Sequence, residues 1–541
     1  MPYLVARSWL AITCAAFLSA CASETPSSPP PTEDPPTVPY DGPWAQLPET
    51  GEWTDRGALS ACTVPGPQPS KCYDPARIDL SGCDQASLAS LELRGAIYLT
   101  EMRNELRARS IHPMSGGFRF DANGRLVTLL ERPASGETQL NGLPFRLRSD
   151  SGKSAFTEID FGDGYAFTFI GCQATSPRTL TGCFVLCRND LVLSHGTFRA
   201  ERMTWRENEP EASGLALVSE SHVAQGTPMD VYVTRGHAYV VSVPRLGNPG
   251  GLTVLDVSDP RNPVYRAAIS LPNDSFWNGV WAKDEALYIA SATSGVLIFD
   301  ITDPARPAFV RNETGNIPGP VDVHTVFVEG DRLYAMSPSA KQTLIFDVSA
   351  PLSPTLVSSY AYPNATSIPH DAFASGGRLY INHGKDGFLV VDVTSEQPAL
   401  LGKYTFPYVF SHANAVGVFN GRTIAFEGGE GQGTHLRVLD VTNPVGIAKV
   451  GEYRLRDLTS IHNMVLVGSR LYIAHYHEGV RVLDVSDPTR PREVAHFNSF
   501  RETDPGRTDR LFDGAIGIRV PGDGYVYVVD KARGLLILDE P

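Results

Sequence analysis

The sequence predicts a mainly β protein in which a small disulfide-containing α+β domain, built on an antiparallel sheet or barrel, precedes a seven-bladed β-propeller. Three observations predict this fold. The 541 residues include 49 Gly and 42 Pro, a share that favours short elements joined by turns over long helices. A motif in a short apolar strand recurs seven times at a spacing suited to four strands per unit. Six cysteines gather before residue 190, ahead of the repeats.

The beginning of the chain is typical of an exported protein. Arg7 precedes an apolar run from Leu10 to Leu18, which is too short to span a bilayer and has the form of a secretion signal over residues 1–20. The run ends in Leu18-Ser19-Ala20-Cys21, which resembles the lipobox of bacterial lipoproteins. The resemblance implies a lipid on Cys21 and attachment to the outer membrane of the cell envelope, on either side. The alternative is an ordinary signal peptide with an incidental cysteine.

Residues 21–44 are expected to hold the lipidated cysteine and a tether. Seven prolines lie between Glu24 and Tyr40 among Ser, Thr, Glu and Asp, a composition that stays extended and packs no core. The whole chain carries 60 acidic and 46 basic residues, a net charge of −14, without a Lys/Arg-rich stripe. This excludes nucleic acid as an expected partner. The lipid makes the membrane the first expected partner, with an envelope protein or glycan as the second.

Residues 45–208 are predicted to form the first domain. Asp84 is expected to cap a helix that reaches about Arg107, because apolar residues recur at helical spacing. The stripe consists of Leu88, Leu91, Leu99, Met102 and Leu106. Strand-like runs follow at Phe118, 126–130, 145–147, 165–170, 184–186 and 198–203. The dipeptides at 123–124, 141–142 and 163–164 suit tight hairpin turns between them.

The cysteines of this domain are expected to pair in the oxidising envelope. They are Cys62, Cys72, Cys83, Cys172, Cys183 and Cys187. An even number in one segment indicates up to three disulfides, among which the sequence leaves fifteen connectivities open. Zinc is the alternative, but the spacings contain no Cys-x-x-Cys knuckle.

Residues 212–541 contain the repeats. The strings include GLTVLDVSDP, GVLIFDITDP and GVRVLDVSDP, and each has an aspartate near its end. These are Asp256, Asp300, Asp347, Asp392, Asp440, Asp484 and Asp539, separated by 44, 47, 45, 48, 44 and 55 positions. Each unit is predicted to be one four-stranded blade. The seventh unit stops after its third strand, so the strand-like run 215–219 is expected to complete it and close the ring.

The repeat units resemble the LVIVD-repeat family of bacterial exported proteins, which is named for this third-strand motif. The resemblance extends over residues 212–541. It implies a propeller fold and an extracytoplasmic setting. It implies no reaction, because the family has no single assigned activity.

Histidines recur at one position, the entrance of the first strand of a unit, which we term the entry slot. Four consecutive units carry His324, His370, His412 and His462 there, whereas the others have Met229, Asn278 and Ile516. A second position, at the end of the second strand, carries His383, Glu427 and His475. Both positions are expected on one face, at the mouth of the central channel. Neutral imidazoles on rigid strands suit zinc, copper or iron.

The histidine pattern has two further interpretations. Each imidazole is able to bond the backbone of a neighbouring blade, in which case the slot was duplicated with the repeat. The cluster is also suited to holding a ligand without metal. The insertion 499–513 and the loop 428–434 are expected at the same face, the first as a solvated charged loop.

Two functions follow from these patterns. The first is an envelope-anchored binding module that takes a protein, glycan or small ligand at the channel mouth. The second is a metal-dependent oxidoreductase that uses His324, His370, His412 and His462 as ligands, with His383, His475 and Glu427 as additional candidates. A purely architectural role in the envelope is the third interpretation. The sequence identifies no catalytic residue, since hydrolase and dinucleotide-binding motifs are missing.

Overall fold

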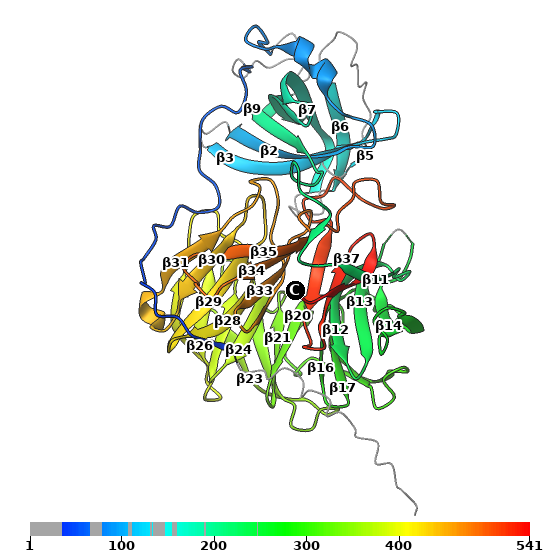
Figure 1. Ribbon diagram of the computed structural model, residues 1–541, viewed down its shortest axis with the longest axis vertical. Helices are drawn as coiled ribbons and strands as arrows, with labels where there is room; N and C mark the ends of the chain where they lie inside the picture. The colour runs from blue at the N-terminus through cyan, green and yellow to red at the C-terminus, as the bar shows by residue number, and fades with distance from the viewer. Residues whose placement is uncertain are drawn as a thin grey trace, which may run out of the picture.

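The computed structural model describes residues 35–64, 78–106, 111–129, 132–133, 146–153, 160–188, 191–245 and 247–541. These residues form one large antiparallel sheet and a ring of smaller sheets (Figure 1). The large sheet lies over one face of the ring. The predicted mainly β fold with a seven-bladed propeller is confirmed.

The large sheet, which we term the first sheet, has eight strands in the order β5-β4-β3-β2-β9-β8-β7-β6. They are β2 (Ile97–Leu106), β3 (Ile111–Phe120), β4 (Leu126–Leu129), β5 (Arg132–Pro133), β6 (Arg146–Lys153), β7 (Asp160–Ser176), β8 (Thr179–Arg188) and β9 (Leu191–Arg202). Gly124 has φ of 77° in the predicted turn between β3 and β4. The predicted turn at 163–164 is wrong, because both residues lie within β7. The turn predicted at 141–142 lies outside the described residues.

The helix predicted from Asp84 to Arg107 is wrong. Asp84 does cap a helix, accepting from the amide of Ser87, but this is the short 3-10 helix η2 (Gln85–Ser90). Gly95 then has φ of 67°, and the chain enters β2, which pairs with β3 and β9. Leu88, Leu99 and Met102 are buried as expected. Their spacing fits both a helix and a turn followed by a strand, and the β-branched and aromatic residues of 97–100 favour the strand.

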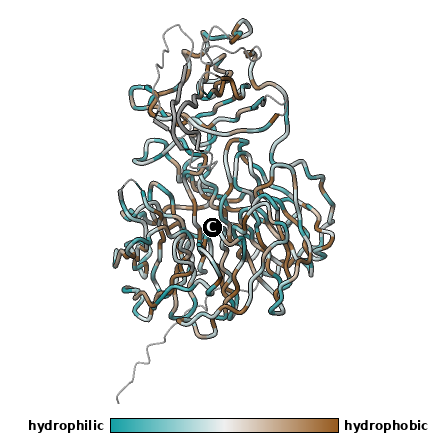
Figure 2. Tube along the Cα trace, turned by 180° about the vertical axis from the view of Figure 1, so that it is seen from behind, coloured by the Kyte–Doolittle hydropathy of each residue, from teal (hydrophilic) through white to brown (hydrophobic). Residues whose placement is uncertain are grey.

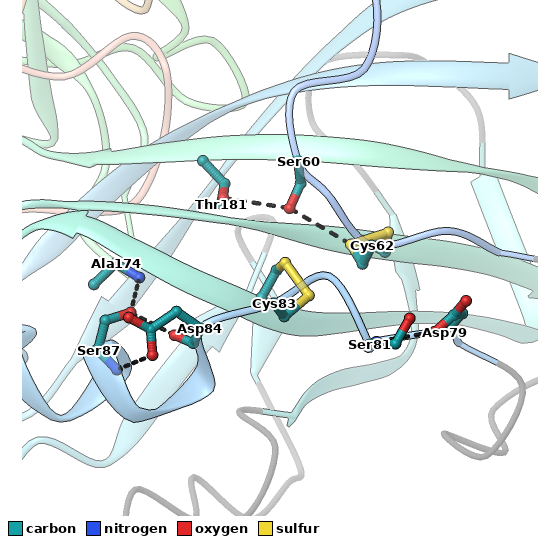
Figure 3. Close-up of a disulfide and its surroundings, with 11 residues drawn as sticks. Ser60, Cys62, Asp79, Ser81, Cys83, Asp84, Ser87, Ala174 and Thr181 are labelled. Carbon is teal, nitrogen blue, oxygen red and sulfur yellow. Dashed lines mark hydrogen bonds between the residues drawn. A yellow bond between two sulfur atoms is a disulfide. The ribbon is translucent and has the colours of Figure 1, made fainter.

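Two disulfides hold the segment before η2 against the first sheet (Figure 3). Cys62 is bonded to Cys183, and Cys83 to Cys172. Cys187 is disulfide-bonded as well, and Cys72 lies outside the described residues. Ser60 lies beside the first bond and hydrogen-bonds Thr181 at 3.3 Å. The cysteines therefore stabilise the fold by linking distant segments. Cys62, Cys83 and Cys172 lie close enough together to hold an ion, but each is bonded in a disulfide.

Among the described residues, seven antiparallel sheets of four principal strands make the ring. Blades one to three are β12 (Thr227–Thr234), β13 (His237–Val243), β14 (Gly251–Asp256), β15 (Val264–Ile269); β16 (Trp277–Lys283), β17 (Ala286–Ser291), β18 (Gly295–Asp300), β19 (Ala308–Glu313); and β20 (Thr325–Glu329), β21 (Arg332–Ser337), β22 (Gln342–Asp347), β23 (Thr355–Ala361). Blades four and five are β24 (Asp371–Ser375), β25 (Arg378–Asn382), β26 (Phe388–Asp392), β27 (Ala399–Tyr404); and β28 (Ser411–Phe419), β29 (Arg422–Gly429), β30 (Leu436–Asp440), β31 (Ala448–Tyr453), with the 3-10 helix η3 (Pro444–Gly446) before β31. Blades six and seven are β32 (Met464–Val467), β33 (Arg470–Ala474), β34 (Val480–Asp484), β35 (Arg492–Phe497); and β36 (Ala515–Arg519), β37 (Tyr525–Asp530), β38 (Gly534–Asp539) with β11 (Leu217–Ser221).

The repeated aspartate has a local structural role. At the end of the third strand of blades one to six, its carboxylate accepts from the amide two residues later, at 2.7 to 3.0 Å. The residue that donates is Ser or Thr in each case. This Asx turn directs the chain out of the strand, which explains why the motif recurs.

The ring closes as predicted. β11 comes before the first blade in the chain and pairs with β38 of the last, with Glu220 opposite Leu536. The short β10 (Ala212–Ser213) pairs with β35 of blade six. The segment ahead of blade one therefore joins two blades at the end of the ring, which removes the open edge between the first and last units.

The end of the predicted tether is bound to the propeller. In residues 35–53, which we term the strap, β1 (Thr37–Val38) pairs with β28 in parallel. Further on, Glu49 and Glu52 contact the buried guanidinium of Arg437 in blade five, and Glu52 also lies 2.7 Å from His435. Residues 35–44 of the predicted tether are thus not a free spacer, since β1 adds to blade five. The domain start predicted at 45 is wrong for residues 45–53, because the carboxylates of Glu49 and Glu52 pair with a buried cation of the propeller.

The first sheet and the 499–513 insertion cover one face of the ring. Ile97 and Leu99 of β2 belong to one buried cluster with Phe500, Phe512 and Tyr476. The expectation of a solvated loop is wrong: Arg507 is fully buried and contacts Asp513 and Asp530 at 3.0 and 2.8 Å. Asp513 of the same insertion and Asp530, which lies 23 residues away in the chain, neutralise its charge. The composition of the loop does not reveal this burial.

Hydrophobic residues follow the strands, while hydrophilic residues predominate in the turns (Figure 2). The third strands are buried over most of their length, as in β18 and β38. Each blade stacks on its two neighbours, so both faces of its sheet are buried. This is the arrangement expected when one repeat forms one blade. In the part of the chain that the structure describes, no helix is long and apolar enough to cross a membrane.

Candidate functional site

A channel of about 1500 Å³ runs through the centre of the ring. Its wall is made by the first strands of the blades, from β12 to β36. At one end it reaches exposed turns between first and second strands, at Arg235, Asp284 and Gly330. We term this the open end. The other end, where the first strands begin, lies under the buried cluster of the first sheet and the insertion, and we term it the closed end.

The four entry-slot histidines line the closed end side by side. The ring centroids are 4.2 Å apart for His324 and His370, 4.1 Å for His370 and His412, and 4.4 Å for His412 and His462. Backbone bonds fix the slot, since the amides of His324, His370 and His462 donate to carbonyls of the second strand. We term these four residues the histidine arc.

Glu430 joins the histidine arc, and sequence reasoning did not single it out. It follows β29, and its amide donates to the carbonyl of Phe410 at 3.0 Å. Its Oε2 lies 3.7 Å from Nε2 of His412, and its Oε1 lies 3.9 Å from Nε2 of His462. Tyr476 donates a 2.6 Å hydrogen bond to Oε1. The only signal in the sequence was the place of Glu430 in a loop, 428–434, expected on this face.

Side chains of the entry slot contact the next blade. Asn278 donates to the carbonyl of His324 at 3.1 Å, and Nδ1 of His462 lies 2.7 Å from the carbonyl of Ile516. These two contacts fit the interpretation that slot side chains join neighbouring blades. The same contact leaves Nε2 of His462 as its acceptor nitrogen, because Nδ1 must carry the proton that it donates.

The imidazoles of the arc are neutral at pH 7. Burial lowers the pKa of His324 to about 4. Burial also lowers the pKa of His412, and it lowers the pKa values of His370 and His462 well below the usual range, assisted by the neighbouring imidazoles. A neutral imidazole has one lone pair for a proton or a metal ion.

The second predicted set does not line the channel. His383 has Nδ1 3.0 Å from Asp386 of its own blade. Glu427 is buried beside Ser411 and Arg437, and burial raises its pKa to about 7. His475 is buried near Glu478, and burial lowers its pKa to about 4. The end of the second strand lies one layer outside the first strand, so these side chains face between blades.

Farther along the channel, toward the open end, the wall carries charged side chains and then aromatic ones. Asp230 and Asp371, each next to an entry slot, face the cavity with Arg519, whose guanidinium is 3.4 Å from Asp230. Burial raises the pKa of both carboxyls, that of Asp371 to about 7. Two residues further along the strands lies the aromatic arc, a series of rings from blades one to four. It consists of Tyr232, Trp281, Phe327 and Phe373, with successive centroids 5.2, 4.7 and 5.1 Å apart.

Five segments of the chain match a known repeat. Residues 225–267, 278–314, 323–362, 462–499 and 515–539 match the LVIVD repeat. The protein carries LVIVD repeats. The matched segments correspond to blades one, two, three, six and seven of this LVIVD-repeat propeller. Blades four and five, which hold His370, His412 and Glu430, lie outside those segments.

The LVIVD-repeat propeller is also similar to a solved structure. This is the Cps50 (Swd1) beta-propeller domain of Myceliophteria thermophila, at 12% identity and a TM-score of 0.43. The match covers 59% of this chain and 99% of that domain. No curated protein matches the sequence.

Proposed function

We propose that this protein is an interaction module whose propeller takes a small organic molecule into the channel through the open end. The cavity of about 1500 Å³ carries the proposal, since it is large enough for such a molecule and reaches solvent at exposed turns. The sequence suggested a protein, glycan or small ligand at the histidine-bearing mouth. The first sheet covers that mouth, which favours a small molecule entering from the opposite side.

The channel wall favours a ligand with a flat apolar part and polar groups at one edge. The aromatic arc offers rings on one side of the channel, and Trp281 also lies 4.8 Å from the guanidinium of Arg519. Asp230 and Asp371 add hydrogen-bonding groups on the way to the closed end. Aromatic walls with a few polar groups are typical of small-molecule sites.

Isothermal titration calorimetry tests the proposal. Benzoate, indole, adenosine and glucose are each titrated into the full-length protein, and a saturable heat of binding is recorded. Asn463, which lines the channel, is changed to Trp to narrow it, and Arg261→Ala, at an exposed turn, is the control. We expect at least one probe to bind the protein and the control, and not N463W. Binding that is unchanged in N463W, or no saturable heat with any probe, would contradict the proposal.

A metal-dependent oxidoreductase is the second candidate. The approach of Glu430 to His412 and His462 favours it, since imidazole and carboxylate are ligands of redox-active iron. It requires iron or copper at the closed end. Elemental analysis of protein from its native host tests this, and a protein that holds zinc alone there would exclude this function.

We also propose that a lipid on Cys21 attaches the protein to the bacterial outer membrane. The lipobox-like sequence supports this, and disulfides such as Cys62–Cys183 suit an oxidising envelope. Fractionation of cells that express the protein or Cys21→Ala tests it. We expect the protein in the membrane fraction and the variant in the soluble fraction. The same distribution for both would contradict the anchor.

A further inference from the structure

We propose that His370, His412 and Glu430 bind one divalent first-row transition-metal ion at the closed end of the channel, with His462 as a fourth ligand. The proposal goes beyond the binding of a small molecule and does not depend on it. It also changes the ligand set that the sequence suggested, because it adds Glu430 and leaves out His324.

The donor atoms already lie close together. One ligand atom from each of His370, His412 and Glu430 falls within 4.8 Å of the others. Donors around a tetrahedral ion with bonds of about 2.1 Å lie roughly 3.4 Å apart. The 3.7 Å between His412 and Glu430 is close to that value. Small side-chain rotations therefore bring the three donors into coordination.

The buried imidazoles of the site are only weakly satisfied by the described residues. His412 is 1% exposed, and its ring contacts the backbone of His462, but neither ring nitrogen makes a well-formed hydrogen bond to a described residue. His370 is 8% exposed, and its ring contacts the backbone of His412, but its Nδ1 makes no well-formed hydrogen bond to a described residue. Buried polar atoms are normally satisfied, so exceptions call for an explanation. A metal ion would take the lone pair of each imidazole.

Other contacts orient the donor atoms and distinguish the histidines that can bind the metal from the one that cannot. Tyr476 and the backbone of Phe410 hold Glu430, as second partners hold metal-binding carboxylates. His462 has Nδ1 at the carbonyl of Ile516, so its Nε2 is available beside Glu430. His324 instead has Nε2 3.3 Å from the amide of Asn278, which makes it a neighbour of the site rather than a ligand.

The ligands point to zinc or ferrous iron. Two or three neutral imidazoles and one carboxylate are the donors of catalytic zinc sites and of non-haem iron sites. The channel leads from the open end to these donors, which leaves a coordination position toward the cavity. All three principal ligands come from blades four and five, which the family comparison leaves unmatched.

Metal titration of the full-length protein, freed of metal with a chelator, tests the proposal. Calorimetry with Zn²⁺ measures affinity and stoichiometry, and the visible absorption of bound Co²⁺ reports nitrogen and oxygen ligands. We expect one ion per chain. His412→Gln and Glu430→Gln keep side-chain size, and we expect each to weaken binding about 100-fold and to change the Co²⁺ spectrum.

His383→Gln is the matched control, because His383 is an equally buried histidine that faces Asp386 instead of the channel. We expect it to bind the metal as the unaltered protein does. Thermal unfolding of each variant without metal checks the fold. The side chain of Glu430 is partly exposed, so we expect Glu430→Gln to fold even if His412→Gln does not. Binding that is absent in the unaltered protein, or unchanged in a folded Glu430→Gln variant, would overturn the proposal.

Discussion

The hydroxyl of Tyr476 donates a 2.6 Å hydrogen bond to Glu430, and this bond joins blade six to blade five at the closed end of the channel. Tyr476 has φ of 40°, a left-handed conformation that costs a residue with a side chain about 1 kcal/mol. Backbone bonds to Ala515 at 2.9 and 3.1 Å hold it there. Strained residues of this kind gather at functional sites, which agrees with a metal site at Glu430.

Tyr476→Phe removes this hydrogen bond and keeps the ring. Partners that orient a metal ligand typically contribute about 10-fold to metal affinity or more. We therefore expect Y476F to weaken Zn²⁺ binding about 10-fold by calorimetry while the protein stays folded. Tyr472→Phe, whose hydroxyl contacts Glu540 away from the channel, is the control. Equal affinities of Y476F and the unaltered protein would show that Glu430 needs no such support.

Acid is expected to destabilise the protein through its buried histidines. Burial lowers the pKa of His477 to about 4 in the folded chain, against about 6.5 when unfolded. The unfolded chain thus binds more protons between pH 6.5 and 4, and the free energy of unfolding falls as the pH is lowered, by about 1.4 kcal/mol per unit for one histidine. Urea unfolding of H477Q between pH 7.5 and 4.5 should show a smaller decline. An identical decline would contradict the burial assignment.

Asp371→Asn should act in the opposite direction. Burial raises the pKa of Asp371 to about 7, so the folded chain keeps a proton that the unfolded chain loses above about pH 4. Its contribution to the free energy of unfolding falls as the pH rises from 4 to 7. We expect D371N to be more stable than the unaltered protein at pH 8.5, by about 2 kcal/mol after allowance for the water-accessible channel, and nearly equal at about pH 4. The same difference at both pH values would exclude a raised pKa.

Arg507→Ala tests the cover at the closed end. The fully buried guanidinium pairs with Asp513 and Asp530, and its loss leaves two buried carboxylates without their cation. Removing one partner of a buried ion pair costs about 3–5 kcal/mol. The matched control is Arg501→Ala in the same insertion. Arg501 is 41% exposed and pairs with Glu211 at the surface, so its loss is expected to lower the free energy of unfolding by about 1 kcal/mol or less. Urea unfolding with similar losses for both variants would contradict the difference in burial.

The propeller was predictable because each repeat contains the residues that determine its own strands and turns. The aspartate of the third strand forms the same turn in six blades, and apolar runs of fixed length surround it. The missing fourth strand of the last unit required a strand elsewhere, and β11 supplies it. The histidine arc followed from the same alignment, because equivalent positions in blades lie at equivalent places in a ring.

The features that the sequence did not predict involve residues outside the repeat pattern. Glu430 lies in a loop without counterparts in the other blades, so no alignment drew attention to it. Arg507 looked solvated because its partner Asp530 is 23 residues away in the chain. The segment 84–107 has apolar residues at spacings common to a helix and to a turn followed by a strand, and its pairing with β3 and β9 decides for the strand.

Anomalous diffraction from zinc-soaked crystals of the full-length protein tests the metal site most directly. We predict a peak at the zinc absorption edge about 2.1 Å from nitrogens of His370 and His412 and from an oxygen of Glu430. A cluster of Glu209, Glu493 and His496 offers a second group of donors, but Arg206 and Arg481 already neutralise it. A peak at that cluster alone, or none at the closed end of the channel, would contradict the account.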